Sequence, residues 1–177
     1  SLITTGVQNT IIGGDAGDAL TSSNNNLAIG YKALSADTVG TKTTAIGFEA
    51  LMSQNFTSNT DSFNVAVGYT AGREITTGVQ NTLIGALAGD ALTDADANIA
   101  IGKGALTTDT LGSSSVAIGN NALTNQNFTS ATDTYNVAIG KNAGLSVSTG
   151  TENTLIGGLA GDALTVGNSN VAVGTHA

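Results

Sequence analysis

The sequence contains no cysteine, proline or tryptophan, and only 4% of its 177 residues are aromatic. Without cysteine the chain has neither disulfide bonds nor thiolate metal sites. Only 10% of the residues are charged, whereas 24 residues are glycine. Because large side chains are few and small ones many, the composition favours a thin core built by stacking repeated layers over a single globular core.

Basic residues are also scarce, so that the net charge is −8 and the pI is about 4.1. This balance argues against nucleic acid or an anionic membrane as a partner. No apolar run approaches the roughly 20 residues that a membrane-spanning helix needs, so we predict no membrane segment here. The chain begins without methionine and stops in the middle of a repeat unit. We therefore expect residues 1–177 to be a segment of a longer fibre.

One short motif recurs along the whole chain, and Asn64–Gly68 (Asn-Val-Ala-Val-Gly) is one copy of it. Ten copies follow one another at spacings of 17 or 21 residues, nested in a 72-residue cassette that is present about two and a half times. Such periods indicate stacked units. We therefore predict a single repeat array over residues 1–177, all-β, folded as a parallel β-roll or β-solenoid of about ten coils. The glycine of each copy is predicted to form a tight corner: Gly13, Gly30, Gly47, Gly68, Gly85, Gly102, Gly119, Gly140, Gly157 and Gly174.

The residues around each glycine predict a short strand and one core side chain per coil. None of the four residues before any of the ten glycines is charged, so we expect a strand that is buried on both faces. Some units then have leucine four residues after the glycine, as at Leu34. The others have glycine there and an apolar residue three positions later, as at Gly17 and Leu20. One apolar side chain per unit, delivered from either place, is what a repeating core layer requires.

An asparagine four residues before the glycine recurs in most units, and Thr43 and Ser115 replace it in the other two. In stacked coils a semi-buried asparagine can hydrogen-bond the backbone and the equivalent asparagine of the next coil. We predict an asparagine ladder formed by Asn9, Asn26, Asn64, Asn81, Asn98, Asn136, Asn153 and Asn170.

Each cassette has one longer unit, and the two long units together bring four aromatic side chains. Insertions in a solenoid form loops on one face, often the binding face. These loops are the predicted contact surface, with the alternative that the rings pack back on the roll or against a neighbouring chain: Phe56, Phe63, Phe128 and Tyr135. The same loops carry glycosylation sequons at Asn55 and Asn127.

No catalytic set of residues is recognisable. The single histidine, His176, lies at the end of the chain. Residues 13–20 resemble the calcium-binding nonapeptide of toxin β-rolls, but one aspartate per cassette is too few for an ion that takes six to eight oxygen ligands. We predict that the chain is not an enzyme and that it holds no cofactor or metal.

Each unit buries few apolar side chains relative to the entropy lost on ordering it, so burial against other copies is expected, with cyclic symmetry. The motif Asn-Val-Ala-Ile-Gly-x-x-Ala, as in residues 136–143, resembles the repeat of the head domains of trimeric autotransporter adhesins, the YadA-like family, and of related phage tail-fibre arrays. The resemblance covers essentially the whole chain. It implies a left-handed roll, an intertwined homotrimer and a place outside the cell, on a cell surface or a virion fibre.

The sequence therefore predicts a structural or adhesive extracellular fibre segment, an adhesin head or shaft or a tail-fibre shaft. It would present loops or a distal tip to a surface receptor or glycan. Two alternatives stay open: a self-assembling extracellular filament subunit, and a ligand-binding solenoid that takes ice or glycan. Ice binding would need flat ranks of threonine, and the threonines at Thr4–Thr5 and Thr107–Thr108 suggest clusters in turns.

Overall fold

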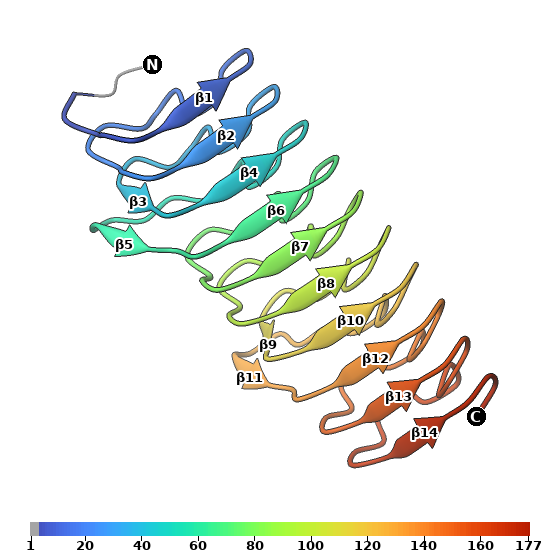
Figure 1. The fold of residues 1–177 in the computed structure, drawn as a ribbon. Coiled ribbons are helices and arrows are strands. Elements are labelled where there is room, and N and C mark those ends of the chain that lie inside the picture. The colour runs from blue at the N-terminus through green and yellow to red at the C-terminus, as the bar shows by residue number, and fades with distance from the viewer. Residues whose placement is uncertain (1–3) are drawn as a thin grey trace.

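A computed structural model describes residues 4–177 as one stack of coils, each of which contributes a three-residue strand to a single parallel sheet. The described residues contain strands and turns and no helix, hence none that could cross a membrane. The strands β1 and β14 lie at opposite ends of the stack (Figure 1). The predicted all-β solenoid of about ten coils is confirmed. The ten strands, in their order in the sheet, are β1 (Thr10–Ile12), β2 (Leu27–Ile29), β4 (Thr44–Ile46), β6 (Val65–Val67), β7 (Thr82–Ile84), β8 (Ile99–Ile101), β10 (Val116–Ile118), β12 (Val137–Ile139), β13 (Thr154–Ile156) and β14 (Val171–Val173).

Two further pairs of strands mark the long units on a second side of the stack (Figure 1). In the first cassette β3 (Gly40–Thr41) pairs in parallel with β5 (Thr60–Asp61). In the second cassette β9 (Gly112–Ser113) pairs in the same way with β11 (Thr132–Asp133). The long coil therefore pairs with the preceding coil both here and in the large sheet, after most of its extra residues.

In each three-residue strand of the large sheet the middle side chain points inward to the core, and the side chains before and after it point outward. In β6 the side chain of Ala66 is fully buried, while Val65 and Val67 on either side of it are half-buried. The same alternation holds in the other inner strands, because side chains of a strand point alternately to its two faces. The expectation that both faces of the strand are buried is therefore wrong for the single chain: the inner face is covered, and the outer face is not.

The core of each coil is filled by one large side chain that comes from either of two places, as the sequence indicates. Leu34 and Leu20 are both fully buried, although they belong to the two different kinds of unit. The position four residues after the corner glycine has positive φ in both kinds, 53° at Leu34 and 60° at Gly72. Where glycine stands there, the space is taken by neighbours, since a Cβ on Gly72 would lie 2.7 Å from Cδ1 of Leu83. The two kinds of unit thus differ in packing while sharing one backbone.

The corner glycines form a column in which successive coils touch backbone to backbone. Gly68 has φ of +146°, in a region that side chains rarely adopt. A Cβ added to Gly68 would lie 2.4 Å from the carbonyl oxygen of Gly85 in the next coil. From Gly13 to Gly157 the corresponding distances are 2.1–2.7 Å. Both the dihedral angle and the space therefore require glycine at each of these corners.

The recurrent asparagines link each coil to the next through both ends of the side-chain amide. The Asn81 Nδ2 atom donates to the carbonyl oxygen of Ala95 at 2.8 Å, and its Oδ1 accepts from the backbone N–H of Asn98 at 3.0 Å. Asn81 and Asn98 are both fully buried. The same Oδ1-to-backbone bond starts from Asn9, Asn26, Asn64, Asn98, Asn136 and Asn153.

Buried polar side chains connect the ladder across the long unit. The Gln126 Nε2 atom donates to Asp109 at 2.6 Å, and its Oε1 accepts from Asn136 Nδ2 at 2.8 Å. Asp109 also accepts from the backbone N–H of Gly112 and of Phe128. A carboxylate only accepts, so Asp109 fixes which way the Gln126 amide points, and Gln126 in turn orients Asn136. The first cassette has the same chain of bonds from Asp37 through Gln54 to Asn64.

We predict that Gly68→Ala lowers the free energy of unfolding by about 3 kcal/mol or more, since it forces a strained φ and a backbone clash. The matched control is Gly158→Ala, because a Cβ at Gly158 meets nothing within 4 Å, and its effect should stay within about 0.5 kcal/mol. Urea unfolding followed by circular dichroism measures both. Equal stability of the two variants would contradict the corner argument.

We also predict that Asn81→Ala lowers the free energy of unfolding by about 2–6 kcal/mol, because it leaves a buried N–H and a buried carbonyl without partners at about 1–3 kcal/mol each. Asn120→Ala is the control, since Asn120 is exposed. The same urea titration applies, and a cost for Asn81→Ala no larger than that of Asn120→Ala would show that the ladder contributes nothing to stability.

Candidate interaction surface

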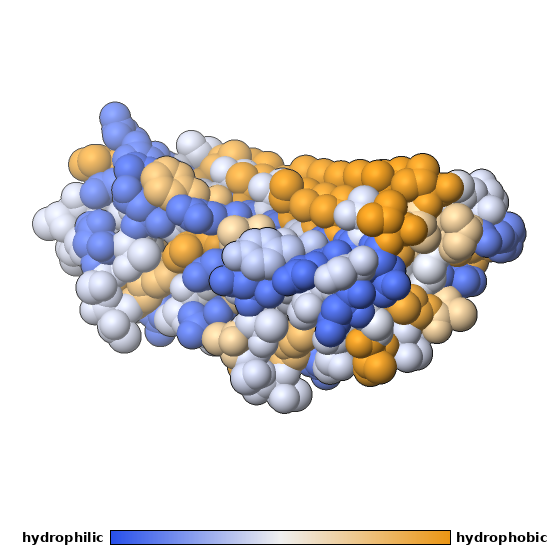
Figure 2. Space-filling model, turned by 90° about the horizontal axis from the view of Figure 1, so that it is seen from below, coloured by the Kyte–Doolittle hydropathy of each residue, from blue (hydrophilic) through white to orange (hydrophobic). Residues whose placement is uncertain are grey.

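The outer face of the ten-stranded sheet is an uncharged surface that runs the length of the rod. Its exposed fractions include 58% at Ile12, 38% at Ile84 and 37% at Ile139. Figure 2 shows apolar side chains gathered in a broad band along one side of the molecule. The row that directly precedes the corner glycines is Ile12, Ile29, Ile46, Val67, Ile84, Ile101, Ile118, Ile139, Ile156 and Val173.

Such a surface is unusual for a sheet of this kind. Sheets made only of parallel strands normally have both faces covered, and monomeric proteins rarely expose large contiguous apolar patches. The second outward row of the face consists of threonine, valine, leucine and isoleucine, as at Thr44 and Val116. A face of this composition is suited to packing against another apolar surface.

The aromatic residues of the long units divide into two pairs. Phe56 and Phe128 are only 5% and 7% exposed, and a Cβ on Gly40 would meet the Phe56 ring at 2.8 Å. Phe56 and Phe128 therefore do not belong to an exposed contact surface in the single chain; for these two residues the alternative, that the rings pack back on the roll, holds. Phe63 and Tyr135, at 50% and 58% exposure, do face solvent.

Three aromatic rings that the sequence analysis did not single out form an exposed stack. Tyr31, Phe48 and Tyr69 each follow a corner glycine directly, on three successive coils. The ring centroids of Tyr31 and Phe48 are 5.5 Å apart, and those of Phe48 and Tyr69 are 5.2 Å apart. The three residues are 45%, 40% and 57% exposed. We call them the aromatic ladder. Aligning the units on their glycines would have found it, since the three residues share one column.

A rank of hydroxyl-bearing side chains also appears once the coils are in register. Thr21, Thr76 and Thr93 each donate their hydroxyl to the carbonyl oxygen of the equivalent residue in the next coil, at 2.9–3.3 Å. Threonines are thus ranked more regularly than the turn clusters suggested. Because these hydroxyl protons are used within the rod, the rank gives little support to ice binding.

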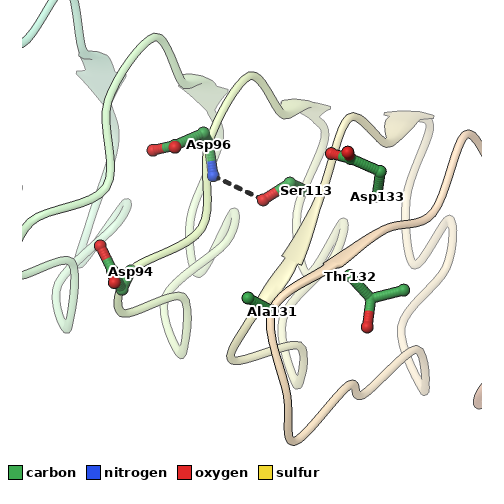
Figure 3. A pocket seen from close by; sticks show the side chains of 6 residues that line it. All are labelled: Asp94, Asp96, Ser113, Ala131, Thr132 and Asp133. Carbon is green, nitrogen blue, oxygen red and sulfur yellow. Dashed lines mark hydrogen bonds between the residues drawn. The ribbon is translucent and has the colours of Figure 1, made fainter.

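An open hollow of about 330 Å³ lies between Asp94, Asp96 and Asp133 (Figure 3). Ser113 lies between Asp96 and Asp133, and its hydroxyl accepts from the Asp96 backbone N–H at 2.9 Å. The three carboxylates do not converge (Figure 3). In residues 4–177 no group of three or more histidine, cysteine, aspartate or glutamate side chains is placed to hold a metal ion.

No family model, no curated protein and no solved structure matches the chain. The likeness to YadA-like heads thus stays a prediction from the repeat motif.

A charged pair between the first long loop and the coil before it distinguishes the two cassettes. Lys42 Nζ lies 2.5 Å from Asp61 and 5.1 Å from the centroid of the Phe63 ring. Hydrogen bonds from Lys42 and then from Thr41 lower the pKa of Asp61 below its usual value. In the second cassette Ser114 stands at the position of Lys42, one cassette length further on.

We predict that Lys42→Ala raises the pKa of Asp61 toward its ordinary value, because the first of these donors is lost. The stabilisation from a carboxylate of depressed pKa is present above the ordinary value and is lost as the pH falls through the folded-state value. As the pH falls through the folded-state pKa of Asp61, the wild-type protein should therefore lose the stabilisation that this carboxylate provides. Lys42→Ala should lose less stability over the same pH range. Carboxyl-carbon NMR titration measures the shift. Lys103→Ala, on a different coil, should leave the Asp61 curve unchanged; an unchanged Asp61 curve in Lys42→Ala would refute the assignment.

Proposed function

We propose that the chain is a segment of an extracellular, non-enzymatic fibre, in which several copies pack side by side through the outer face of the sheet. The observation that carries the proposal is the uncharged outer face, which stays half-exposed along the whole rod in the single chain. Covering it would give the parallel sheet its missing second layer.

A second copy of the chain is the partner that fits this face best. The outward side chains repeat once per coil, in register from β1 to β14. A partner with the same axial repeat can match these rows over the full length, and identical rods have that repeat by construction. Closed cyclic symmetry then buries one face per chain. The resemblance to YadA-like heads favours three chains and a left-handed roll.

The function that follows is mechanical. Hydrogen-bonded ladders run from coil to coil, and interchain packing would stiffen the rod further. A stiff rod serves as a spacer or adhesive shaft that presents its loops or a distal tip for attachment. A place on a cell surface or a virion fibre rests on the resemblance of the repeat.

We predict a solution mass near three times the chain mass of 17.4 kDa, measured by light scattering on a sizing column. The double variant Ile46→Lys/Ile118→Lys, which charges the same position in both cassettes, should fall to the monomer mass because it places lysines in an apolar interface. Asn120→Lys adds the same charge at an exposed position and should keep the wild-type mass. A wild type that is monomeric at micromolar concentration would refute the proposal.

A further inference from the structure

The apolar outer face of the sheet has two edges whose side chains differ in charge. The ten strands are parallel and their arrows all point the same way (Figure 1). The residues that follow the strands therefore line one edge of the face, and the residues that precede the strands line the other. We define the corner edge as the two residues after each corner glycine, and the leading edge as the seventh to fifth residues before each corner glycine.

In the last five coils the two edges carry opposite charges. The corner edge there has two lysines and no acidic residue, whereas the leading edge has three acidic residues and no basic one. The lysines are Lys103 and Lys141, and the acidic residues are Asp96, Asp133 and Glu152. In the first five coils the charges of each edge nearly cancel: the corner edge has Asp15, Lys32 and Glu49, and the leading edge has Lys42 and Asp61, which pair with each other.

The lysines of the corner edge have no ionic partner in their own chain. In residues 4–177 the only basic residues that form ion pairs are Lys42 and Arg73. Lys141 is exposed, and its neighbours in the same row are the uncharged Asn120 and Gly158. A Cβ on Gly158 would meet nothing within 4 Å, so the space beside Lys141 is open. Its charge is therefore available to a group from outside the chain.

We propose that the corner edge of one chain packs against the leading edge of the next chain, with both chains parallel and level along the rod. Lys141 then lies beside Tyr135 and Glu152 of the next chain, and Lys103 lies beside Asp96 of that chain. The proposal rests on the side-by-side assembly proposed above, and it specifies which sides of neighbouring chains meet.

Cyclic symmetry about an axis parallel to the rod brings unlike edges together. Rotation about such an axis leaves every coil at its own height, so β12 of one chain is level with β12 of the next. It also places each corner edge beside the leading edge of a neighbour. A two-fold axis across the rod would instead reverse one chain and bring like edges together. The opposite charges of the edges favour the first arrangement, because complementary charges select partner and register.

The narrow outer face allows the edges to take part in the same contact. A strand rises about 3.3 Å per residue, so three residues span about 10 Å, and packed sheets also lie about 10 Å apart. Chains whose apolar faces touch are therefore close enough for long side chains at the edges to meet. Tyr135, Lys141 and Glu152 are all exposed.

The two cassettes show a joint change at these positions. Residue 69 of the first cassette corresponds to residue 141 of the second, and residue 80 corresponds to residue 152. Where the corner edge has Tyr69, whose ring stacks on Phe48 in its own chain, the leading edge has the uncharged Gln80. Where the corner edge has Lys141, the leading edge has Glu152. Lys141 follows β12 whereas Glu152 precedes β13, at the opposite edge of the sheet, so a contact between chains accounts for the joint change.

The leading edge also has room for a side chain of a neighbouring chain. The open hollow of Figure 3 lies on this edge, with Asp96 and Asp133 on either side. Asp96 precedes β8 and Lys103 follows it, so in level chains Lys103 of one chain faces the hollow of the next.

Engineered cysteines test which edges meet, because the chain has none of its own. The variant Tyr135→Cys/Lys141→Cys places one thiol on each edge of one coil. The two positions lie at opposite ends of β12, so they are not expected to pair within a chain. We expect mild oxidation to link whole chains into a closed ring, which a non-reducing denaturing gel shows as a series of bands that ends at the mass of the native oligomer. Each single variant should run as a monomer.

The matched control is Phe63→Cys/Lys141→Cys, which uses the same two edges at different heights. Phe63 precedes β6, four strands from β12 in the sheet. Strands are spaced by about 4.8 Å, so the two thiols should be about 19 Å apart along the rod and form no ring. Light scattering on the reduced variants checks that each assembles as wild type does.

The outcomes separate this proposal from the assembly on which it rests. If wild type is an oligomer but Tyr135→Cys/Lys141→Cys gives no more covalent product than the single variants, the edge pairing is overturned and side-by-side packing stands. Covalent dimers of Tyr135→Cys alone would also overturn it, because like edges would then meet. A monomeric wild type would overturn the assembly and the edge pairing together.

An exchange of charges gives a second test without cysteine. Lys141→Glu places like charges on facing edges, so the oligomer should dissociate at a concentration at least about threefold higher, in keeping with exposed ion pairs repeated around a ring. Glu152→Lys should act in the same way, and Lys141→Glu/Glu152→Lys should regain the wild-type value. Light scattering over a dilution series measures all three. A double variant that dissociates as readily as the single variants would count against the pairing of Lys141 with Glu152.

Discussion

The contact between each corner glycine and the carbonyl of the next corner sets the geometry of the whole rod. A Cβ on Gly47 would lie 2.1 Å from the carbonyl oxygen of Gly68, so no other residue permits two coils to approach as closely. This approach keeps strands of only three residues paired in register along ten coils. The inward strand residue is alanine in most coils, as at Ala66, and leucine at Leu83 and Leu155, whose side chains fill the space beside neighbouring glycines. The glycine-rich composition is therefore a consequence of the close approach of the coils.

Strict register turns every position of the repeat into a row along the rod. One row becomes the asparagine ladder, another the rank of threonine hydroxyls, and another the uncharged outer face. Each row serves a different purpose because only its side chain changes, while the backbone is held by the column of glycines. Leu34 and Gly72 show how far this extends, since both occupy the same left-handed position. The side chains of a row can therefore change while the backbone contacts that hold the coils together stay the same.

The sequence was informative wherever the repeat itself carried the constraint. Spacing predicted the solenoid and its coil number, invariance of glycine predicted the corners, and the alternation of Leu34 with Gly17 and Leu20 predicted one core side chain per coil. Side-chain direction at the turns was harder to predict, because hydropathy does not distinguish a ring that points inward from one that points outward. Phe56 is buried and Phe63, in the same loop, is exposed. The aromatic ladder was missed for a different reason: it exists only as a column across coils, in one cassette of the array.

An apolar face and an aromatic row on one repeat place different demands on the rod. The outer face would suit a partner of the same periodicity, and in the proposed assembly other copies of the chain would supply it. The aromatic ladder places no such demand, because Tyr31, Phe48 and Tyr69 stack on one another within the chain. One repeat can therefore carry a row whose contacts are completed within the chain beside a row whose contacts would be completed only between chains.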